Sequence, residues 1–256
     1  MTDLLKLARD LVTVATGAGR ITLQYHRNNA AIMDKLDGSP VTIADQEAEA
    51  FIVRELQILA PEIPIVGEEG VAAGYIPDIS GGTFFLVDAL DGTREFISGG
   101  DDYTVNIALM KDFMPVMGVI SVPVRGITYF GAAGQAFAVD KDGKEEKISV
   151  RPVPEEGLTV VGSSLSDDPN AVQKFLEGRK VKDFVKLSSS LKFCAVATGE
   201  ADFFPRMGPT CEWDIAAGEA ILNAAGGVVT QLDGKPMVYG KLDRKFLNTS
   251  FVAHAA

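Results

Sequence analysis

The feature that most restricts the fold is a change in the pattern of elements near residues 151–156. Before this point, two helical segments are followed by short apolar runs separated by turns, a pattern typical of an antiparallel meander. After it, apolar runs alternate with helical periodicity, as in an α/β unit. We therefore expect two lobes that share a cleft, an N-terminal α+β lobe over residues 1–145 and a C-terminal α/β lobe over residues 146–256.

Spacing of apolar residues gives the expected elements. Leu4, Leu7 and Leu11 recur at three- and four-residue intervals, which predicts an amphipathic first helix. Turns are expected at residues 37–40, 67–70 and 141–144. The expected helices are residues 3–26, 42–59, 170–177, 191–198 and 213–225. The expected strands are residues 63–66, 83–87, 103–110, 115–122, 126–131, 136–139, 158–161, 184–187, 202–204 and 227–230.

Composition excludes several classes of protein. The chain has 256 residues, of which 46% are hydrophobic and 23% charged, as in an ordinary globular protein. Its apolar runs are shorter than the roughly 20 residues of a membrane helix, and residues 1–6 lack the features of a secretory signal. Two cysteines suit a reducing compartment. We expect a soluble, cytoplasmic protein and leave peripheral association with a membrane surface open.

The charge balance limits the ligands. Lys and Arg total 24 and Asp and Glu total 35, so the net charge is −11. Such a field disfavours nucleic acid, because a protein that binds a long phosphate backbone needs a basic surface. A small phosphorylated ligand remains compatible if the site supplies positive charge of its own, and bound metal ions are the usual source of that charge.

Scarce residue types narrow the chemistry further. His26 and His254 are the two histidines, which makes a His-rich zinc site or a Ser-His-Asp triad improbable. Cys194 and Cys211 lack the close spacing of a cysteine metal site. Carboxylates are therefore expected to carry the chemistry.

A pair of carboxylates follows the apolar run at residues 83–87. The run leads to Asp88, and Asp91 follows three residues later in a turn that Gly92 allows. Two carboxylates and a backbone carbonyl at the end of a strand would form an oxygen-rich site, which suits Mg²⁺. Taken alone, the same residues also fit an ordinary turn.

Three more acidic positions stand at the starts or ends of expected elements. Glu68 follows a short strand and fits either a site or a solvated turn. Asp214 lies in the first turn of the helix expected at residues 213–225, where the helix dipole also favours a carboxylate. Asp45, beside Thr42, also fits a capping residue.

Taken together, these clusters resemble the inositol monophosphatase-like family of Mg²⁺-dependent, lithium-sensitive phosphomonoesterases. The similarity extends from residues 39–42 to residues 246–248, and the segments 88–93 and 213–218 are its most specific motifs. It implies a layered αβαβα architecture, the α+β sandwich of the inositol monophosphatase and fructose-1,6-bisphosphatase type. The usual motif has Pro where this chain has Ala89, a change expected to reduce rigidity of the turn.

The resemblance also implies roles for single residues. The first metal site would use Glu68, Asp88 and the carbonyl of Leu90, and the second would use Asp88, Asp91 and Asp214. A third, weaker ion near Glu68 would bring the number of Mg²⁺ ions to two or three. Thr93 and Asp45 would orient and help to deprotonate the attacking water, together with Glu68 as a catalytic group. Glu69 is a secondary candidate.

The resemblance implies that the C-terminal lobe selects the substrate, and several segments of the chain indicate which substrate that is. Segments 93–96, 103–109, 188–194 and 204–210 resemble the 3′(2′),5′-bisphosphate nucleotidase branch of the family. Arg206 stands where the inositol branch has a Glu that binds sugar hydroxyls, and a guanidinium suits a second phosphate or a base. The expected substrate-binding residues are Gly92, Thr93, Gly162, Ser163, Ser189, Lys192 and Arg206, with Ser164 beside them for the 5′-phosphate.

The expected reaction is removal of the 3′-phosphate from adenosine 3′,5′-bisphosphate to give AMP and phosphate, which would clear a by-product of sulfate assimilation. The sulfated analogue, 3′-phosphoadenosine 5′-phosphosulfate, is a second expected substrate. Alternatives are an inositol-1-phosphate or broad sugar-phosphate phosphatase with the same metal centre, and a catalytically silent nucleotide- or metal-binding regulator. Whether the protein is a monomer or a homodimer stays open.

Overall fold

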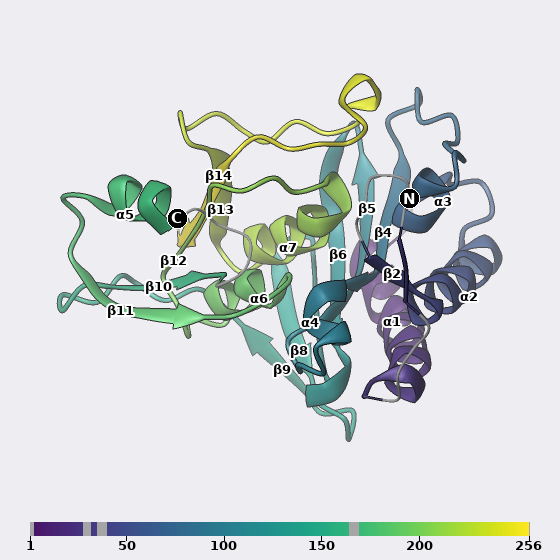
Figure 1. Ribbon diagram of the computed structural model, residues 1–256, viewed down its shortest axis with the longest axis horizontal. Helices are drawn as coiled ribbons and strands as arrows, with labels where there is room; N and C mark the ends of the chain where they lie inside the picture. The colour runs from purple at the N-terminus through teal and green to yellow at the C-terminus, as the bar shows by residue number, and fades with distance from the viewer. Residues whose placement is uncertain (1–2, 28–31, 35–39, 164–168, 256) are drawn as a thin grey trace.

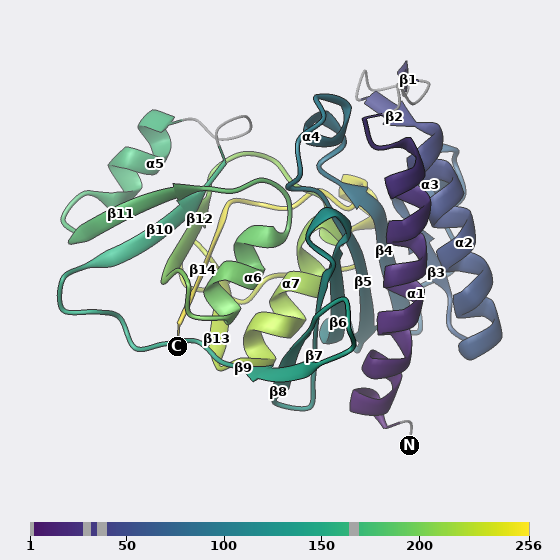
Figure 2. The same ribbon diagram turned by 90° about the horizontal axis from the view of Figure 1, so that it is seen from below.

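The computed structural model describes residues 3–27, 32–34, 40–163 and 169–255, and its elements form five alternating layers of helices and sheets (Figures 1 and 2). In Figure 2 the layers follow one another from α1 and α2 on one side to α5 on the other. The expected αβαβα architecture is therefore confirmed. Residues 37–39 of the turn expected at residues 37–40, and Ser164, lie outside the described residues.

The first layer contains the two long helices α1 (Leu4–Tyr25) and α2 (Ile43–Leu59). The Asp3 side chain caps α1 by accepting from the backbone N–H of Leu5 and Lys6. Thr42 and Asp45 form a capping box at the start of α2, so the expected helix start is confirmed. Apolar faces of both helices pack on the first sheet and form a buried core there.

A seven-stranded sheet forms the second layer, in the order β3-β4-β5-β6-β7-β8-β9. Strand β3 is parallel to β4, and every later pair is antiparallel, which confirms the expected meander. Sequence analysis missed β9 because its residues are Glu-Glu-Lys-Ile and contain no apolar run. The strands are β3 (Ile65–Gly67), β4 (Phe84–Asp91), β5 (Thr104–Lys111), β6 (Met114–Val122), β7 (Ile127–Ala132), β8 (Gln135–Val139) and β9 (Glu145–Ile148).

Two segments that were expected to be loops contain regular secondary structure. The turn at residues 67–70 is instead the start of a short helix, α3 (Glu68–Ala72). Asp88 and Asp91 belong to β4 rather than to a loop after it, and the pairing of β4 with β5 shifts register between them. The remaining short elements are β1 (Ile32–Asp34), β2 (Pro40–Thr42), α4 (Thr93–Ile97), η1 (Pro123–Arg125) and η2 (Leu242–Arg244).

Helices α6 (Leu191–Ala197) and α7 (Glu212–Ala224) form the central layer between the two sheets. Their residues are almost all buried, because each helix has a sheet on either side or another helix beside it. Glycine makes the close packing of α7 possible. A Cβ on Gly118 of β6 would lie 2.2 Å from the backbone oxygen of Ala217 in α7.

The second sheet has five strands in the order β11-β10-β12-β14-β13, with α5 (Pro169–Leu176) on its outer face. Strands β11, β10 and β12 run parallel, and β14 is antiparallel to both of its neighbours. Sequence analysis missed β14, which ends the described chain. The strands are β10 (Leu158–Gly162), β11 (Val181–Lys186), β12 (Phe203–Arg206), β13 (Gly227–Gln231) and β14 (Phe251–Ala255).

The seven-stranded sheet ends at Ile148 and the five-stranded sheet begins at Leu158. The division into lobes of residues 1–145 and 146–256 remains a prediction. Among the described residues, none of the helices combines the length and the apolar character that crossing a bilayer requires.

Candidate active site

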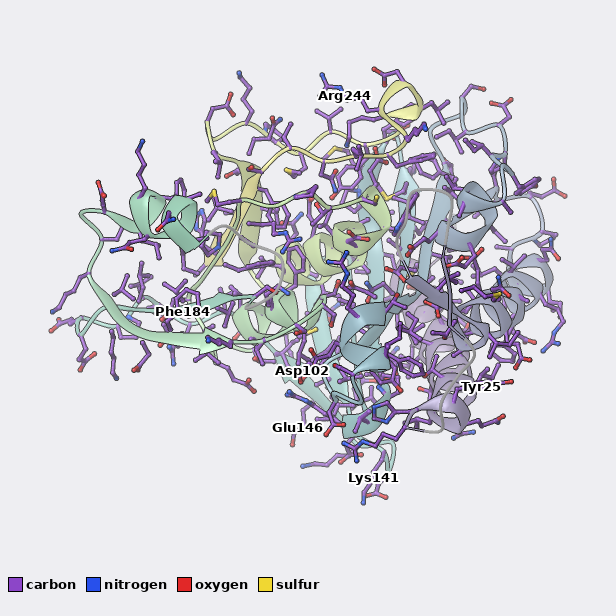
Figure 3. The ribbon with its side chains drawn as sticks, viewed as in Figure 1. Tyr25, Asp102, Lys141, Glu146, Phe184 and Arg244 are labelled. Carbon is purple, nitrogen blue, oxygen red and sulfur yellow. The ribbon has the colours of Figure 1, made fainter. Side chains whose placement is uncertain are left out.

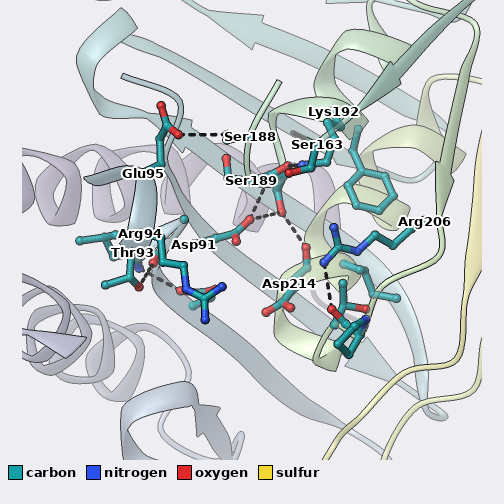
Figure 4. A pocket seen from close by; sticks show the side chains of 18 of the residues that line it. Asp91, Thr93, Arg94, Glu95, Ser163, Ser188, Ser189, Lys192, Arg206 and Asp214 are labelled. Carbon is teal, nitrogen blue, oxygen red and sulfur yellow. Dashed lines mark hydrogen bonds between the residues drawn. The ribbon is translucent and has the colours of Figure 1, made fainter. Parts of the chain in front are cut away.

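A cavity of about 680 Å³ lies where β4, α3 and α4 meet α6, α7 and β12 (Figure 4). Its walls include four carboxylates from distant parts of the chain, those of Glu68, Asp88, Asp91 and Asp214. The backbone of Leu90 lies among them. All five positions expected to hold metal ions therefore line one cavity.

Asp88 and Asp91 are positioned by the end of β4. Asp88 is buried, and one of its carboxylate oxygens accepts from the backbone N–H of Leu90 at 2.9 Å. Asp91 Oδ2 accepts from the backbone N–H of Ser190 at 2.6 Å and from the Ser190 hydroxyl at 2.9 Å. Its Oδ1 accepts no hydrogen bond from the residues that the structure describes, which leaves this atom available to a ligand.

Asp214 has a similar arrangement on α7. Its Oδ2 accepts from the backbone N–H of Cys211 at 2.7 Å, as part of the capping of the helix. Its backbone oxygen lies 2.6 Å from the Ser190 hydroxyl. Ser190 thus connects Asp91 with Asp214, and sequence analysis did not assign it a role, because these contacts join residues far apart in the chain.

Glu68 is held in place by the buried carboxylate of Glu49 in α2. Glu49 accepts from the backbone N–H groups of Glu69 and Gly70, each at 2.8 Å, and so anchors the first turn of α3. A Cβ on Gly67 would lie 2.5 Å from the Glu49 carboxyl carbon, so this approach requires glycine. Sequence analysis missed Glu49, although its spacing from Asp45 places both on one face of α2.

Thr93 and Asp45 are in contact beside the carboxylates. The Thr93 hydroxyl donates to Asp45 Oδ1 at 3.2 Å, with the backbone oxygen of Leu90 at 3.3 Å as a second acceptor. Asp45 Oδ2 accepts from the backbone N–H and the hydroxyl of Thr42. Burial raises the pKa of Asp45, against the opposing effect of these hydrogen bonds. Glu69 does not line the cavity.

The carboxylates of the cavity influence one another. Burial, followed by the charges of the other three acidic groups, raises the pKa of Asp88 well above its usual value. The pKa of Asp214 rises for the same reasons, burial first and then Asp91 and Glu68, and the charge of Arg206 opposes the rise. Added positive charge would relieve this repulsion.

A divalent cation fits this donor set, since all of the ligands are oxygens, the type that Mg²⁺ prefers. In the part of the chain that the structure describes, no three His, Cys, Asp or Glu side chains lie close enough to enclose a metal ion by themselves. A bound cation would therefore need further oxygen ligands, such as the backbone oxygen of Leu90 and water.

The cavity also has basic side chains. Lys192 and Arg206 are both buried and line it, and their charges are oriented by backbone oxygens of Ser189 at 2.6 Å and Pro209 at 2.9 Å (Figure 4). The buried Ser189 hydroxyl has no hydrogen-bond partner among the described residues.

Gly92, Thr93 and Ser163 also line the cavity, but Gly162 lines a neighbouring cavity instead. Two further lining residues, Arg94 and Glu95, were not among the expected site residues. Both stand next to the Asp-Gly-Thr motif and are charged, which is a signal that sequence analysis could have used.

A sequence model described as the inositol monophosphatase family matches residues 3–255. The chain therefore belongs to this family, whose members are metal-dependent phosphatases, generally with Mg²⁺. The layered fold and the carboxylate cavity agree with that class.

Two of the proteins to which this chain is similar are named CysQ. The chain is 40% identical over 241 residues to the 3′(2′),5′-bisphosphate nucleotidase CysQ of Salmonella typhimurium, covering 93% of this chain and 95% of the relative. It is similar in structure to CysQ from Bacteroides thetaiotaomicron, with a TM-score of 0.80, 33% identity and coverage of 98% and 97%. The IMPase of Thermotoga maritima gives a TM-score of 0.77 at 25% identity, with coverage of 99% and 92%.

Proposed function

We propose that the protein is a Mg²⁺-dependent 3′(2′),5′-bisphosphate nucleotidase that hydrolyses adenosine 3′,5′-bisphosphate to AMP and phosphate. The observation that carries this proposal is a single cavity that is lined both by four carboxylates and by the buried cations Lys192 and Arg206. The carboxylates suit the cations that a phosphate ester needs for hydrolysis, and Lys192 and Arg206 suit a second phosphate. Similarity to CysQ proteins supports the same activity.

The metal sites proposed are those expected from the family resemblance. Glu68, Asp88 and the Leu90 carbonyl would hold one Mg²⁺, and Asp88 would share a second with Asp91 and Asp214. A third ion near Glu68 is included in the proposal. Bound Mg²⁺ would neutralise the phosphate oxygens and acidify the attacking water.

Thr93 and Asp45 are proposed to position that water. Because the Thr93 hydroxyl donates its proton to Asp45, its oxygen can accept a hydrogen bond from the water. As the water loses its proton, that proton would pass to the Thr93 oxygen while the Thr93 hydroxyl proton passes to Asp45 Oδ1, which leaves Asp45 protonated. Glu68 is proposed as a further catalytic group through its place at the first metal site.

Lys192, Arg206 and Ser189 are proposed to bind the second phosphate. These two buried cations favour a phosphate monoester that has a second anionic group over one whose other groups are neutral hydroxyls. Gly92 and Ser163 also line the cavity and are proposed to lie beside the sugar. The sulfated analogue carries a comparable second anion and is proposed as a further substrate.

An inositol-1-phosphate or broad sugar-phosphate phosphatase is the second candidate. The likeness to the Thermotoga maritima IMPase favours it, because the same fold accommodates both kinds of enzyme. Arg206→Glu separates the two. We expect this change to weaken binding of the bisphosphate at least tenfold, with little effect on inositol 1-phosphate. Equal bisphosphate affinity before and after the change would remove Arg206 from the site.

Asp88→Asn tests the activity itself. The wild type is expected to release phosphate from adenosine 3′,5′-bisphosphate with Mg²⁺ present and to be inhibited by Li⁺, whereas the variant is expected to lose this release while remaining folded. A wild type that releases no phosphate from either substrate would support the regulator instead. A homodimer and a cytoplasmic location remain predictions that size measurement and fractionation can test.

A further inference from the structure

A second cavity, of about 640 Å³, lies beside the carboxylate cavity. Ser163 lines both, so the two cavities are neighbours at the end of β10. Helix α5 and the segment after it form one wall of the second cavity, and the ends of β10 and β11 form the other. None of the groups proposed for the metal centre or the second phosphate belongs to it.

The topology of the five-stranded sheet places this cavity at a crossover point. Strand β10 is followed by α5, which packs on the outer face of the sheet with Val160 and Phe203. Its parallel neighbour β11 is followed by α6, which packs on the inner face with Val161 and Phe204. Where adjacent parallel strands lead to helices on opposite faces, a crevice forms at their carboxyl ends, and ligands of open α/β sheets bind there.

The outer face of β11 gives the cavity an aromatic surface. Phe184 pairs with Val160 and Lys186 pairs with Gly162, so these side chains share the face that α5 covers. Phe184 is 48% exposed, which is high for an aromatic side chain within a strand. In Figure 3 it is labelled on the part of the molecule formed by β11.

Gly162 allows the Phe184 ring to lie over the end of β10. A Cβ on Gly162 would be 2.5 Å from the ring, too close for any other residue without a shift of Phe184. Sequence analysis expected Gly162 to help to hold a phosphate. In the structure its lack of a side chain makes room for the Phe184 ring, so it shapes the second cavity rather than the carboxylate cavity.

The other walls combine apolar and polar groups. Val172 and Leu176 of α5 supply apolar surface, and Gln173 and Glu177 supply hydrogen-bonding groups. The Arg179 guanidinium lies 5.4 Å from the Phe175 ring centroid and 4.8 Å from that of Phe203, so it forms a fixed part of the wall. A flat ligand with apolar faces and polar edges fits such a cavity, which is the chemistry of a purine base.

We propose that the second cavity binds the purine base of the substrate, with the ring of Phe184 against one face of the base. This inference rests on the proposed nucleotidase function and adds the site that would select a nucleotide over a smaller phosphate ester. The ribose would lie near Ser163, which both cavities share, and the base would lie between α5 and β11.

Phe184→Ala tests the proposal when two substrates are compared. One is adenosine 3′,5′-bisphosphate, and the other is the same sugar bisphosphate with hydrogen in place of the base. We expect kcat/KM for the nucleotide to fall about tenfold, as for the loss of one base-stacking aromatic, and kcat/KM for the base-free compound to stay within twofold. Phe184→Tyr should retain most of the nucleotide activity because it keeps the ring.

Val185→Ala provides the matched control. Val185 is the next residue of β11, is 41% exposed and points to the opposite face of the strand. It is expected to leave both substrates unchanged. An equal loss for the two substrates in Phe184→Ala, or no loss for either, would overturn the proposal.

Binding of AMP, measured by calorimetry in the presence of Mg²⁺, separates this inference from the proposed activity. If the wild type binds AMP and Phe184→Ala weakens that binding about tenfold, the base site stands even where no 3′-phosphate is released. If the wild type hydrolyses the bisphosphate and Phe184→Ala binds AMP as tightly as the wild type, the activity stands and the base site fails. Absence of AMP binding by the wild type would also overturn the base site.

Discussion

Thr93 is the residue whose geometry bears most directly on the chemical step. Its hydroxyl has Asp45 Oδ1 and the Leu90 oxygen as acceptors, and it begins α4 immediately after Gly92, which has a φ of 97°. That left-handed conformation favours glycine and sets the direction in which α4 leaves β4. A single turn therefore positions both the Leu90 carbonyl and the Thr93 hydroxyl.

Thr93→Ala is expected to lower kcat about 100-fold, in the range typical of lost acid–base assistance, and to change KM little. Thr93→Ser keeps the hydroxyl and should restore kcat to within about tenfold of the wild type. Steady-state kinetics of phosphate release checks both. An unchanged kcat in the alanine variant would refute the role of Thr93 in positioning water.

Ser190 carries a second prediction at this scale. Its hydroxyl bridges Asp91 and the Asp214 backbone, and Asn106 donates to it at 2.9 Å. We expect Ser190→Ala to weaken Mg²⁺ binding about tenfold, because groups that orient metal ligands typically have effects of this size. Calorimetric titration with Mg²⁺ measures it. Ser121→Ala, at a buried serine in β6, is the control, and an equal effect there would contradict the prediction.

At the scale of elements, α3 shows how a short helix is fixed in place by a tertiary contact. Glu49 in α2 accepts from its first turn, and this contact sets the position of Glu68. The sequence suggests a turn here, since five residues are too few for helical periodicity. Sequence analysis also missed β9, because its residues are mostly charged, and α4, because it is little more than a single helical turn. The long helices and apolar strands were predictable because their own periodicity identifies them.

Gly67→Ala should displace α3, since its Cβ would lie 2.5 Å from the Glu49 carboxyl carbon. We expect a loss of about 1–3 kcal/mol in the free energy of unfolding, as for overpacking of a buried site, and weaker Mg²⁺ binding. Gly70→Ala is the control, because its Cβ would lie 3.5 Å from Glu49, an ordinary contact. Chemical denaturation and calorimetry measure the two quantities, and equal stability of the two variants would contradict this account of α3.

At the scale of the whole molecule, two sheets enclose the central helices and bring acidic groups from β4, α3 and α7 to one cavity. The motifs predicted which carboxylates would line this cavity. The contacts that connect them were not predictable, because Ser190, just before α6, meets Asp91, at the end of β4, only in the folded chain. Strand order in the second sheet likewise depends on β14, whose sequence signal is weak.

The buried centre of the molecule also has a titratable group that the proposed reaction does not use. Burial raises the pKa of Glu219 in α7 from 4.5 to about 7, while its hydrogen bond from Tyr239 opposes the rise. Above pH 4.5 the unfolded chain loses this proton and the folded protein keeps it until about pH 7. The folded state therefore binds more protons in this window, and its stability falls as pH rises.

Glu219→Gln should remove this dependence. Between pH 5 and pH 8 we expect the wild type to lose about 2 kcal/mol of stability relative to the variant, from the size of the pKa shift. Denaturant unfolding of both proteins at the two pH values measures the difference. Parallel pH profiles for the two proteins would contradict the raised pKa of Glu219.

The central claim is that one cavity, with carboxylates for Mg²⁺ and the buried cations Lys192 and Arg206 for a second phosphate, selects a bisphosphate nucleotide. Its most direct test is phosphate release by the wild type from adenosine 3′,5′-bisphosphate and from inositol 1-phosphate, each with Mg²⁺ and with a chelator. We predict Mg²⁺-dependent release from both or from the nucleotide alone, with kcat/KM at least 100-fold higher for the nucleotide. A higher kcat/KM for inositol 1-phosphate would contradict the account.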